Sequence, residues 1–373
     1  MLLGAAPAYA DDGAEEPDAA DDAGDAPDER ERDAPDDAEP ALSEREEPAS
    51  AAPEAPAASE APAAAEEPAA PAEPAPARAV RPQPEAELRY TSLSAARVNP
   101  LGLVSFLDLS ARLRLYVHDS DILTQNFVGF GMTGGASPAW GRVGPLVEIQ
   151  PLTILRLYAS YELFGYFNTF NLFASFPSAS ADHSDTTIRD RGGADPPLAS
   201  YPTLGGQFTA GANVQMRLGP VAARNHLRFS YASFDIQRGD RVFYDQLTDL
   251  LQPNDGWFVV NDLDVLLLAD FAPEAGTLAI GARWTYAHSF YEARHFAPGE
   301  DTSLAPDHDI HRLGLLAAYT FEDNQGARFD RPTILLIAQW HLLHRFRTGA
   351  DVHVAAPYLA VAFQFTGDLL SER

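Results

Sequence analysis

The 373-residue sequence contains no cysteine and no lysine. The absence of cysteine excludes disulfides, thiolate metal sites, cysteine nucleophiles and a lipid-modified cysteine. No window of about 20 continuous apolar residues is present, so no transmembrane helix is expected. Basic charge is scarce, because 26 arginines stand against 54 acidic residues, which gives a net charge of −28. This excess of acid argues against nucleic acid as a partner, since phosphate recognition needs basic patches.

Common cofactor and catalytic motifs are also missing. The sequence contains no phosphate-binding loop, no Gly-x-Ser-x-Gly nucleophile elbow and no His-Glu-x-x-His zinc motif. We therefore predict no cofactor and no metal site. Whether the chain is an enzyme stays open at this level.

The N-terminal quarter of the chain differs in composition from the rest. Residues 1–86 hold 24 acidic residues and 5 arginines, and residues 11–86 contain no aromatic side chain. Such a segment cannot bury enough apolar surface to offset its ordering entropy, so 11–86 is predicted to be a disordered, extended linker. A passive tether is one interpretation, and a segment that binds a basic partner is another.

The first ten residues, MLLGAAPAYA, precede this acidic segment. Ala8-Tyr9-Ala10 has the small-x-small form of a signal-peptidase site, so we interpret 1–10 as the remnant of an export signal. An Ala-rich extension of the linker is the alternative. The predicted organisation is thus an export-signal remnant at 1–10, a linker at 11–86 and a folded domain at 87–373.

A regular alternation of polar and apolar residues begins in the stretch FLDLSARLRLYV at 106–117. Its charged residues, Asp108, Arg112 and Arg114, all fall on even positions, whereas the odd positions are apolar. Strict alternation predicts a β-strand with one apolar and one polar face. The same pattern recurs to the end of the chain and predicts ten strands, at 102–117, 139–150, 152–166, 204–218, 220–235, 256–271, 275–291, 308–322, 331–346 and 353–367.

The predicted strands are long for a soluble protein, in which about 5–6 residues is usual. A tilted strand needs about 9–11 residues to cross a bilayer, and each predicted segment is at least that long. The connections alternate in length: short turns near 151, 219 and 273, and long polar stretches at 118–138, 167–203, 236–255 and 292–307. If strand 102–117 runs outward, every long stretch lies outside and both termini return to the inner side.

The sequence therefore predicts an all-β fold, a transmembrane antiparallel up-and-down β-barrel of about ten strands, within a range of about 10–12. Residues 88–98 are either an additional strand or a lead-in. A soluble two-sheet, lectin-like fold is the alternative, and it requires the long segments to break into shorter strands.

Residues from about 100 to 373 resemble the bacterial outer-membrane β-barrel class. The resemblance rests on the alternating strands, the export-like Ala8-Tyr9-Ala10 and the aromatic-rich segment AVAFQF at 360–365. It implies a Gram-negative outer membrane, with membrane lipid and the barrel-assembly machinery as partners and the linker in the periplasm. The chain continues past the last aromatic residue as TGDLLSER, which displaces the terminal signal that such barrels often carry.

The polar strand faces define the predicted lumen. Its residues are charges of both signs: Asp108, Arg112, Arg114, Arg142, Glu148, Arg156, Glu162, Arg217, Arg228, Asp262, Asp264, Asp270, Arg283, Arg312 and Arg345. One interpretation is a network of ion pairs that fills a narrow barrel, since barrels of about eight strands are filled by side chains. The other is a narrow, porin-like pore whose charges select a small solute or ion.

A second constellation lies at the predicted strand ends. Asp119 and Asp121 form one Asp-x-Asp pair, and Asp309 and His311 form an Asp-x-His pair. This is similar to the omptins, ten-stranded outer-membrane proteases, and the resemblance would make these four residues catalytic. The match departs from the omptins because Asp119 and Asp121 lie in the first long loop rather than the second.

The long stretch 167–203 begins with Phe170, Phe173 and Phe176. These aromatic residues are expected to anchor at the membrane interface, to extend strands above the membrane, or to fold back and plug the lumen. Three functions stay open: a channel or structural barrel, a surface-binding or adhesion barrel that acts through its loops, and an omptin-like protease.

Overall fold

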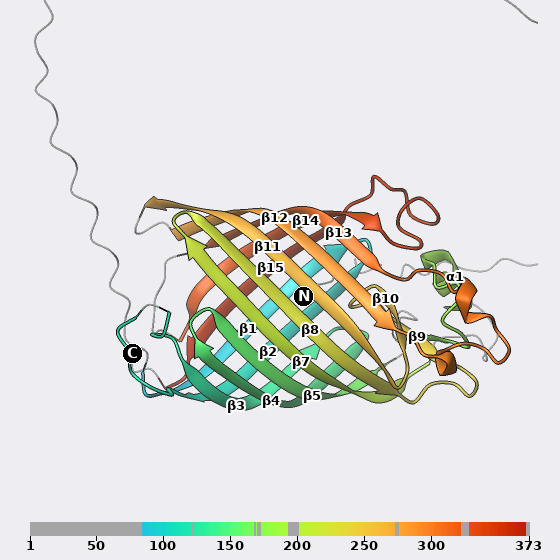
Figure 1. The fold of residues 1–373 in the computed structure, drawn as a ribbon, viewed down its shortest axis with the longest axis horizontal. Coiled ribbons are helices and arrows are strands. Elements are labelled where there is room, and N and C mark those ends of the chain that lie inside the picture. The colour runs from blue at the N-terminus through green and yellow to red at the C-terminus, as the bar shows by residue number, and fades with distance from the viewer. Residues whose placement is uncertain are drawn as a thin grey trace, which may run out of the picture. The chain divides into compact units, whose positions relative to one another are not determined.

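The computed structural model describes residues 84–370, apart from 121, 168, 170–172, 193–200, 273–275 and 322–327. The predicted export-signal remnant at 1–10 lies outside the described residues, as does the predicted linker except for its last three positions. Within the described part, twelve strands form a closed barrel, and one strand follows the next antiparallel around it (Figure 1).

The strands of the barrel are β1 (Ala86–Val98), β2 (Gly102–Leu113), β3 (Phe127–Ala136), β4 (Trp140–Leu152), β5 (Leu155–Tyr166), β7 (Thr203–Leu218), β8 (Val221–Phe234), β11 (Gly256–Ala272), β12 (Gly276–Phe290), β13 (Ile310–Thr320), β14 (Asp330–Leu343) and β15 (Tyr358–Asp368). The barrel closes where β1 pairs with β15, from Arg89 opposite Asp368 to Val98 opposite Leu359. The predicted closed antiparallel β-barrel is confirmed, and the closure leaves no free sheet edge.

The predicted number of about ten strands is wrong, because β1 and β3 were not counted. β1 is the segment that the sequence left open as a strand or a lead-in. β3 lies within 118–138, which was predicted to be a long loop. Its sequence, FVGFGMTGGA, has four glycines, and they remove the alternation that marks the other strands. The glycines are required by close strand packing: a Cβ at Gly131 would lie 1.9 Å from the carbonyl oxygen of Leu109.

The additional strand β1 reverses the predicted direction of β2. We call the end of the barrel that carries Ala86 and Asp368 the terminal end, and the opposite end the cap end. β2 runs toward the terminal end, so the connection 114–126 lies there and not with the other long connections. The Thr153 amide in the β4–β5 turn donates to the carbonyl of Ile122 at 2.8 Å, which places both at this end.

The outer surface of the barrel is apolar. In β2 the outward residues Leu103, Leu107 and Leu113 are exposed, whereas Val104 and Phe106 face inward and are buried. The same alternation places Leu359, Val361 and Phe363 of β15 outside, and the other strands follow it. An apolar band around a closed barrel is the surface that lipid requires.

Long connections at the cap end fold into a separate layer. It contains a three-stranded sheet of β6 (Ala174–Phe176), β9 (Val242–Asp245) and β10 (Leu250–Pro253), the helix α1 (Asp185–Gly192), and two 3-10 turns, η2 (Ala293–His295) and η3 (Thr302–Leu304). We call residues 173–192, 235–255, 291–309 and 344–357 the cap. Figure 1 shows the cap over one end of the barrel. Among the described residues, no helix has the length and apolar character needed to span a bilayer.

The cap sheet is held by an apolar core on each side. Phe173, Phe243 and Leu250 pack into the core of the barrel mouth with residues such as Phe234. Phe176, Val242, Tyr244 and Leu251 form a second core with Phe296. Phe173 therefore folds back into the barrel mouth, which is one of the three alternatives that the sequence left for these aromatic residues. Phe170 lies outside the described residues.

The assignment of the outward face can be tested, because the free-energy cost of an arginine on this face depends on its depth in the bilayer. Leu107 lies in the middle of β2 and is 53% exposed, so Leu107→Arg should cost about 2–4 kcal/mol of folding free energy in lipid vesicles. Leu113→Arg is the matched control, because Leu113 ends the same strand and the cost near an interface is about 0–1 kcal/mol. Urea titration in vesicles measures both costs, and equal costs would contradict the assignment of the lipid face.

Candidate functional site

The inward faces of β1, β2, β4 and β5 carry a continuous chain of ion pairs, which we call wall A. Its centre is Glu148, whose fully buried carboxylate lies 2.7 Å from Arg112 Nε and 2.5 Å from Arg156 Nη2. Arg112 also reaches Glu87 at 3.4 Å, and Arg89 links Glu87 to Asp330 of β14. One carboxylate between two guanidinium groups is a strong arrangement, because charge-assisted hydrogen bonds offset the loss of hydration.

The glycines of strand β3 leave space for the side chains of wall A. β3 lies between β2 and β4, and a Cβ at Gly129 would be 2.8 Å from Glu148 Cγ and 3.2 Å from Arg112 Cγ. A side chain at this position would displace the ion pair. The pairing of Arg112 with Glu148 across two strands therefore depends on a residue without a side chain.

A second set of ion pairs lines β8, β11 and β12, and we call it wall B. Asp264 lies 2.6 Å from Arg283 Nε and 2.8 Å from Arg224 Nη2. Its neighbour Asp262 accepts from Arg228 at 2.7 Å and from the Thr285 hydroxyl at 2.7 Å. The inward carboxylates of β11 are thus each held by an adjacent strand.

Between the walls and the cap lies a layer of aromatic residues. Arg142 pairs with Glu162 at 3.1 Å, and its guanidinium lies 4.7 Å from the ring centre of Phe106. Asp108 accepts from the Thr133 hydroxyl at 2.6 Å. Above them, the cap residue Phe243 packs against Phe234 with ring centres 4.8 Å apart.

The exposure of the arginines differs along the barrel. Arg224 and Arg283 hold the same carboxylate, but 46% of the Arg224 side chain is exposed and only 7% of Arg283. Arg224 lies near the terminal end, as does Arg156. Arg142, Arg97 and Arg312 lie toward the cap end and are largely or fully buried. Solvent therefore reaches the interior from the terminal end more readily than from the cap end.

Three predicted lumen residues lie at or beyond the ends of their strands. Arg114 follows the end of β2, and Arg217, near the terminal end, is exposed and donates to the carbonyl of Gly219 at 3.0 Å. Arg345 lies beyond β14 in the cap and donates to the carbonyl of Ala181 at 2.7 Å. The predicted strands were too long at Arg114 and Arg345, because polar alternation continues into the loops. The side chain of Asp270 is outside the described part.

The sequence prediction missed several inward charges. Glu87, Arg89 and Arg97 lie on β1, which was left open as a strand. Arg224 shares the inward face of β8 with Arg228, four residues later. Alternation was present in both segments and could have identified these residues. Asp330 is the first residue of β14, where no alternation marks it.

The omptin-like constellation does not form. Asp119 lies in the connection at the terminal end and Asp309 at the cap end, so the two pairs are at opposite ends of the barrel. Asp121 lies outside the described residues. His311 stacks on Trp284 with ring centres 5.8 Å apart, on the outward face of the barrel, and Asp309 contacts His288. In the described part of the chain, no group of three or more His, Cys, Asp or Glu side chains is placed to hold a metal ion.

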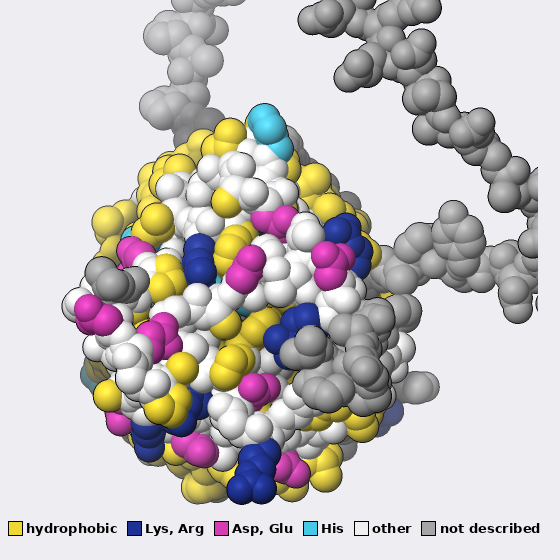
Figure 2. All heavy atoms as spheres, turned by 90° about the vertical axis from the view of Figure 1, so that its right-hand side faces the viewer, with side chains coloured by type: hydrophobic (Ala, Val, Ile, Leu, Met, Phe, Trp, Pro, Cys, Tyr) yellow, Lys and Arg dark blue, Asp and Glu magenta, His cyan; other side chains and the backbone are white. Residues whose placement is uncertain are grey.

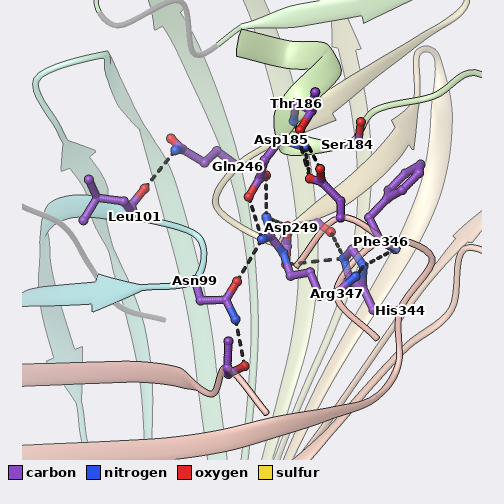
Figure 3. Close-up of polar contacts among 12 residues, drawn as sticks. Asn99, Leu101, Ser184, Asp185, Thr186, Gln246, Asp249, His344, Phe346 and Arg347 are labelled. Atoms are coloured by element: carbon purple, nitrogen blue, oxygen red, sulfur yellow. Dashed lines mark hydrogen bonds and ion pairs between the residues drawn. The ribbon is translucent and has the colours of Figure 1, made fainter. Parts of the chain in front are cut away.

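One arginine joins the cap segments to each other and to the barrel. Arg347 Nε lies 2.7 Å from Asp249, Nη2 lies 2.8 Å from Asp185, and Nη1 lies 2.9 Å from the side-chain oxygen of Asn99 (Figure 3). These partners come from the β9–β10 turn, the start of α1 and the β1–β2 turn. Burial alone would raise the pKa of the Asp249 carboxyl, but Arg347 and His344 hold it well below its usual range. Asp249 is therefore ionised in the closed cap.

Two buried histidines lie side by side in the cap. The rings of His183 and His308 are 5.3 Å apart, and His308 Nε2 lies 2.6 Å from the carbonyl of Ala179. Burial lowers the pKa of His308 to about 4, and Arg345 beside it acts in the same direction. Burial and the neighbouring His308 lower the pKa of His183 well below its usual value. Both imidazoles are neutral at neutral pH.

The comparisons with known proteins concern the fold. No family model and no curated protein matches the chain. Among solved structures, OccAB1 of Acinetobacter baumannii is 13% identical, with a TM-score of 0.35 over 74% of this chain and 60% of that one. CdiB of the same species is 7% identical, with a TM-score of 0.31 over 76% of this chain and 60% of that one. OprD of Pseudomonas aeruginosa is 9% identical, with a TM-score of 0.23 over 76% and 93%.

The closed barrel, its apolar exterior and its charged interior decide the class. The fold is that of the bacterial outer-membrane β-barrels. The match spans about three-fifths of the length of the first two of these structures. Function must therefore be argued from the interior and the cap.

The central ion pair of wall A can be tested by charge removal. Glu148→Gln should lower the free energy of unfolding by about 3 kcal/mol, because it leaves Arg112 and Arg156 in the interior without their shared carboxylate. Glu292→Gln is the control: that carboxylate is 61% exposed, and we expect a change within about 0.5 kcal/mol. Urea unfolding of the refolded barrel measures both. A loss below about 1 kcal/mol for Glu148→Gln would show that wall A does not depend on this residue.

The buried histidines predict that the cap loosens in acid. His308 is neutral in the closed cap down to about pH 4, whereas an exposed histidine takes up a proton near pH 6.5. The stability that neutral His308 contributes is complete above pH about 6.5 and is lost as the pH falls toward about 4, to a total on the order of 3 kcal/mol. Hydrogen exchange of the cap amides, corrected for intrinsic pH dependence, measures it. His308→Gln should weaken the acid response, and His353→Gln, at an exposed site, should not.

Proposed function

We propose that the protein is a gated outer-membrane channel for passive transport of small polar or charged solutes. The observation that carries the proposal is the gradient along the interior. The inward arginines are more exposed near the terminal end, where Arg156 and Arg224 are 29% and 46% exposed, than toward the cap end, where Arg142 is 7% exposed. This pattern fits a water-filled vestibule that ends at a closed gate.

The pattern of ion pairs supports a central passage. The pairs in walls A and B lie within one strand or join strands that are neighbours or next neighbours around the barrel. The charges are thus satisfied along the walls. Barrels of about eight strands are filled by side chains and those of about 16–18 hold aqueous channels, so twelve strands suit a narrow passage. Paired charges along such a passage would favour polar solutes.

The cap fits the role of a gate. It is built from four connections at one end of the barrel, and its sheet seats Phe173 and Phe243 in the mouth. Figure 2 faces this end and shows acidic, arginine and apolar side chains packed across it where residues are described. A folded cap can leave the mouth as a unit without unfolding the barrel, because its second core is its own.

The proposal includes an orientation. The long cap-end connections would face the outside of the cell, and the terminal end would face the periplasm. Both ends of the barrel chain, Ala86 and Asp368, lie at the terminal end, so the acidic segment before residue 84 would lie in the periplasm. Insertion would depend on membrane lipid and on the barrel-assembly machinery.

Planar-bilayer recording of the refolded full chain tests the proposal. The unmodified protein should show discrete openings separated by long closed periods. Phe243→Ala removes a buried ring between cap and barrel, at a cost of about 3–5 kcal/mol, so the open probability should rise at least about tenfold. Phe329→Ala is the matched control, because this ring is 48% exposed and contacts the outward Phe363 and Phe365.

Insertion of each protein is verified by protease protection in vesicles. If inserted Phe243→Ala stays silent, the channel proposal fails. The alternative of a surface-binding barrel that acts through its cap would then take its place. That alternative predicts that ligands bind the cap of a non-conducting protein.

A further inference from the structure

The hairpin of β9 and β10 presents one carboxylate, Asp249, to a set of basic side chains on another segment. Arg347 donates to both oxygens of Asp249, from Nε at 2.7 Å and from Nη2 at 3.0 Å. His344 Nε2 lies 3.4 Å from the same carboxylate, and the Tyr244 hydroxyl donates to it at 2.7 Å. Asp249 is completely buried. This two-point contact is the geometry by which arginine recognises any carboxylate.

The basic side chains continue from the cap into the barrel. His341 of β14 lies 3.8 Å from Asp249, which is beyond hydrogen-bond distance, and its register partner on β13 is Arg312. We call Arg347, His344, His341 and Arg312 the basic row. His344 Nδ1 accepts from two backbone amides, so its proton lies on Nε2, toward Asp249.

Arg312 is the part of the row that lacks an anion. It is 8% exposed, and its Nε and Nη1 atoms are buried without a hydrogen-bond partner among the described residues. The guanidinium lies over the ring of Tyr358 at 4.3 Å. By contrast, the inward arginines of walls A and B have carboxylate partners. A buried cation without an anion is costly, so the site favours an incoming negative group.

We propose that the basic row is an anion-binding site for small carboxylate solutes, which the closed cap fills with its own Asp249. This inference rests on the proposed channel function and names its substrate class. A solute carboxylate would take the place of Asp249 at Arg347 and release the β9–β10 hairpin. Deeper in the barrel it would meet Arg312, which has no partner while the cap is closed.

The contacts explain why displacement would open the mouth. Arg347 holds the hairpin to α1 and to the β1–β2 turn, through Asp185 and Asn99. The rest of the hairpin turn contacts the barrel through Arg97, which donates to the carbonyls of Leu247 and Gln246. Loss of the Asp249 contact therefore removes the charged bond between the hairpin and the other cap segments.

Chemical rescue of Asp249→Gly tests the site. Asp249 has φ of 63°, a conformation that glycine adopts freely, so this change removes the carboxylate with little backbone strain. The amides of β9 and β10 should exchange with deuterium roughly tenfold faster or more, because a charged hydrogen bond is lost. Sodium acetate should restore slow exchange, whereas sodium chloride at the same ionic strength and acetamide should not.

Two variants serve as controls. Asp249→Asn keeps the shape of the side chain and fills the site, so acetate should not slow its exchange. Asp190→Ala removes an exposed carboxylate from α1, and exchange of β9 and β10 should stay unchanged with or without acetate. Equal rescue of Asp249→Gly by acetate and acetamide, or rescue by neither, would overturn the proposal.

The unmodified protein gives a second measurement, which decides alone if Asp249→Gly does not assemble. There acetate competes with Asp249, so it should speed exchange of β9 and β10 relative to chloride. The same rate in both salts would overturn the proposal. Because these experiments read the order of the cap and not conductance, rescue in a silent barrel would retain the anion site and reject the channel.

Discussion

A carboxylate shared by two arginines is the interaction on which the interior of this barrel depends. Glu148 between Arg112 and Arg156, and Asp264 between Arg224 and Arg283, are the two instances. An ion loses several kcal/mol of hydration when it is buried, and only close, hydrogen-bonded partners return it. Sharing one acid between two bases keeps every group paired with few side chains. The interior of the barrel can therefore stay charged.

The burial of Glu148 and Arg112 also constrains the sequence of β3, which carries no charged residue. β3 separates β2 from β4, and its Gly129 leaves the volume that Glu148 and Arg112 occupy. The glycines that make β3 a weak strand by propensity are thus required by the ion pair beside it. The closed hydrogen-bond network of the barrel compensates, since both neighbours hold β3 along its length.

The lipid imposes a simple rule on the sequence, and this is why the fold class and most strand faces were predictable. In β2 and β15, the outward residues are apolar apart from Ser105, so period-two alternation survives. The rule says nothing where both faces carry small residues, as in β3, and the strand was missed there. The two uncounted strands, β1 before and β3 after β2, invert the predicted direction of β2 and move Asp119 to the terminal end. The error in the number of strands therefore also brought Asp119 and Asp309 together in the omptin-like hypothesis.

The cap obeys no periodic rule, and its contacts could not be derived from sequence. Asn99, Asp185, Asp249 and Arg347 meet from four connections, separated by up to 248 positions. Each contact is local to the folded barrel, because all four connections start at the cap end, where β1 and β14 flank β15 and β5 and β8 flank β7. The barrel thus supplies the proximity that a carboxylate and an arginine need. The same proximity explains why a few polar contacts suffice to hold the cap on the barrel. The β9–β10 hairpin is already tethered at both ends, so little entropy opposes its closing. A free carboxylate would have to compete with this tethered one, so displacing Asp249 would require a high solute concentration or further contacts with the basic row.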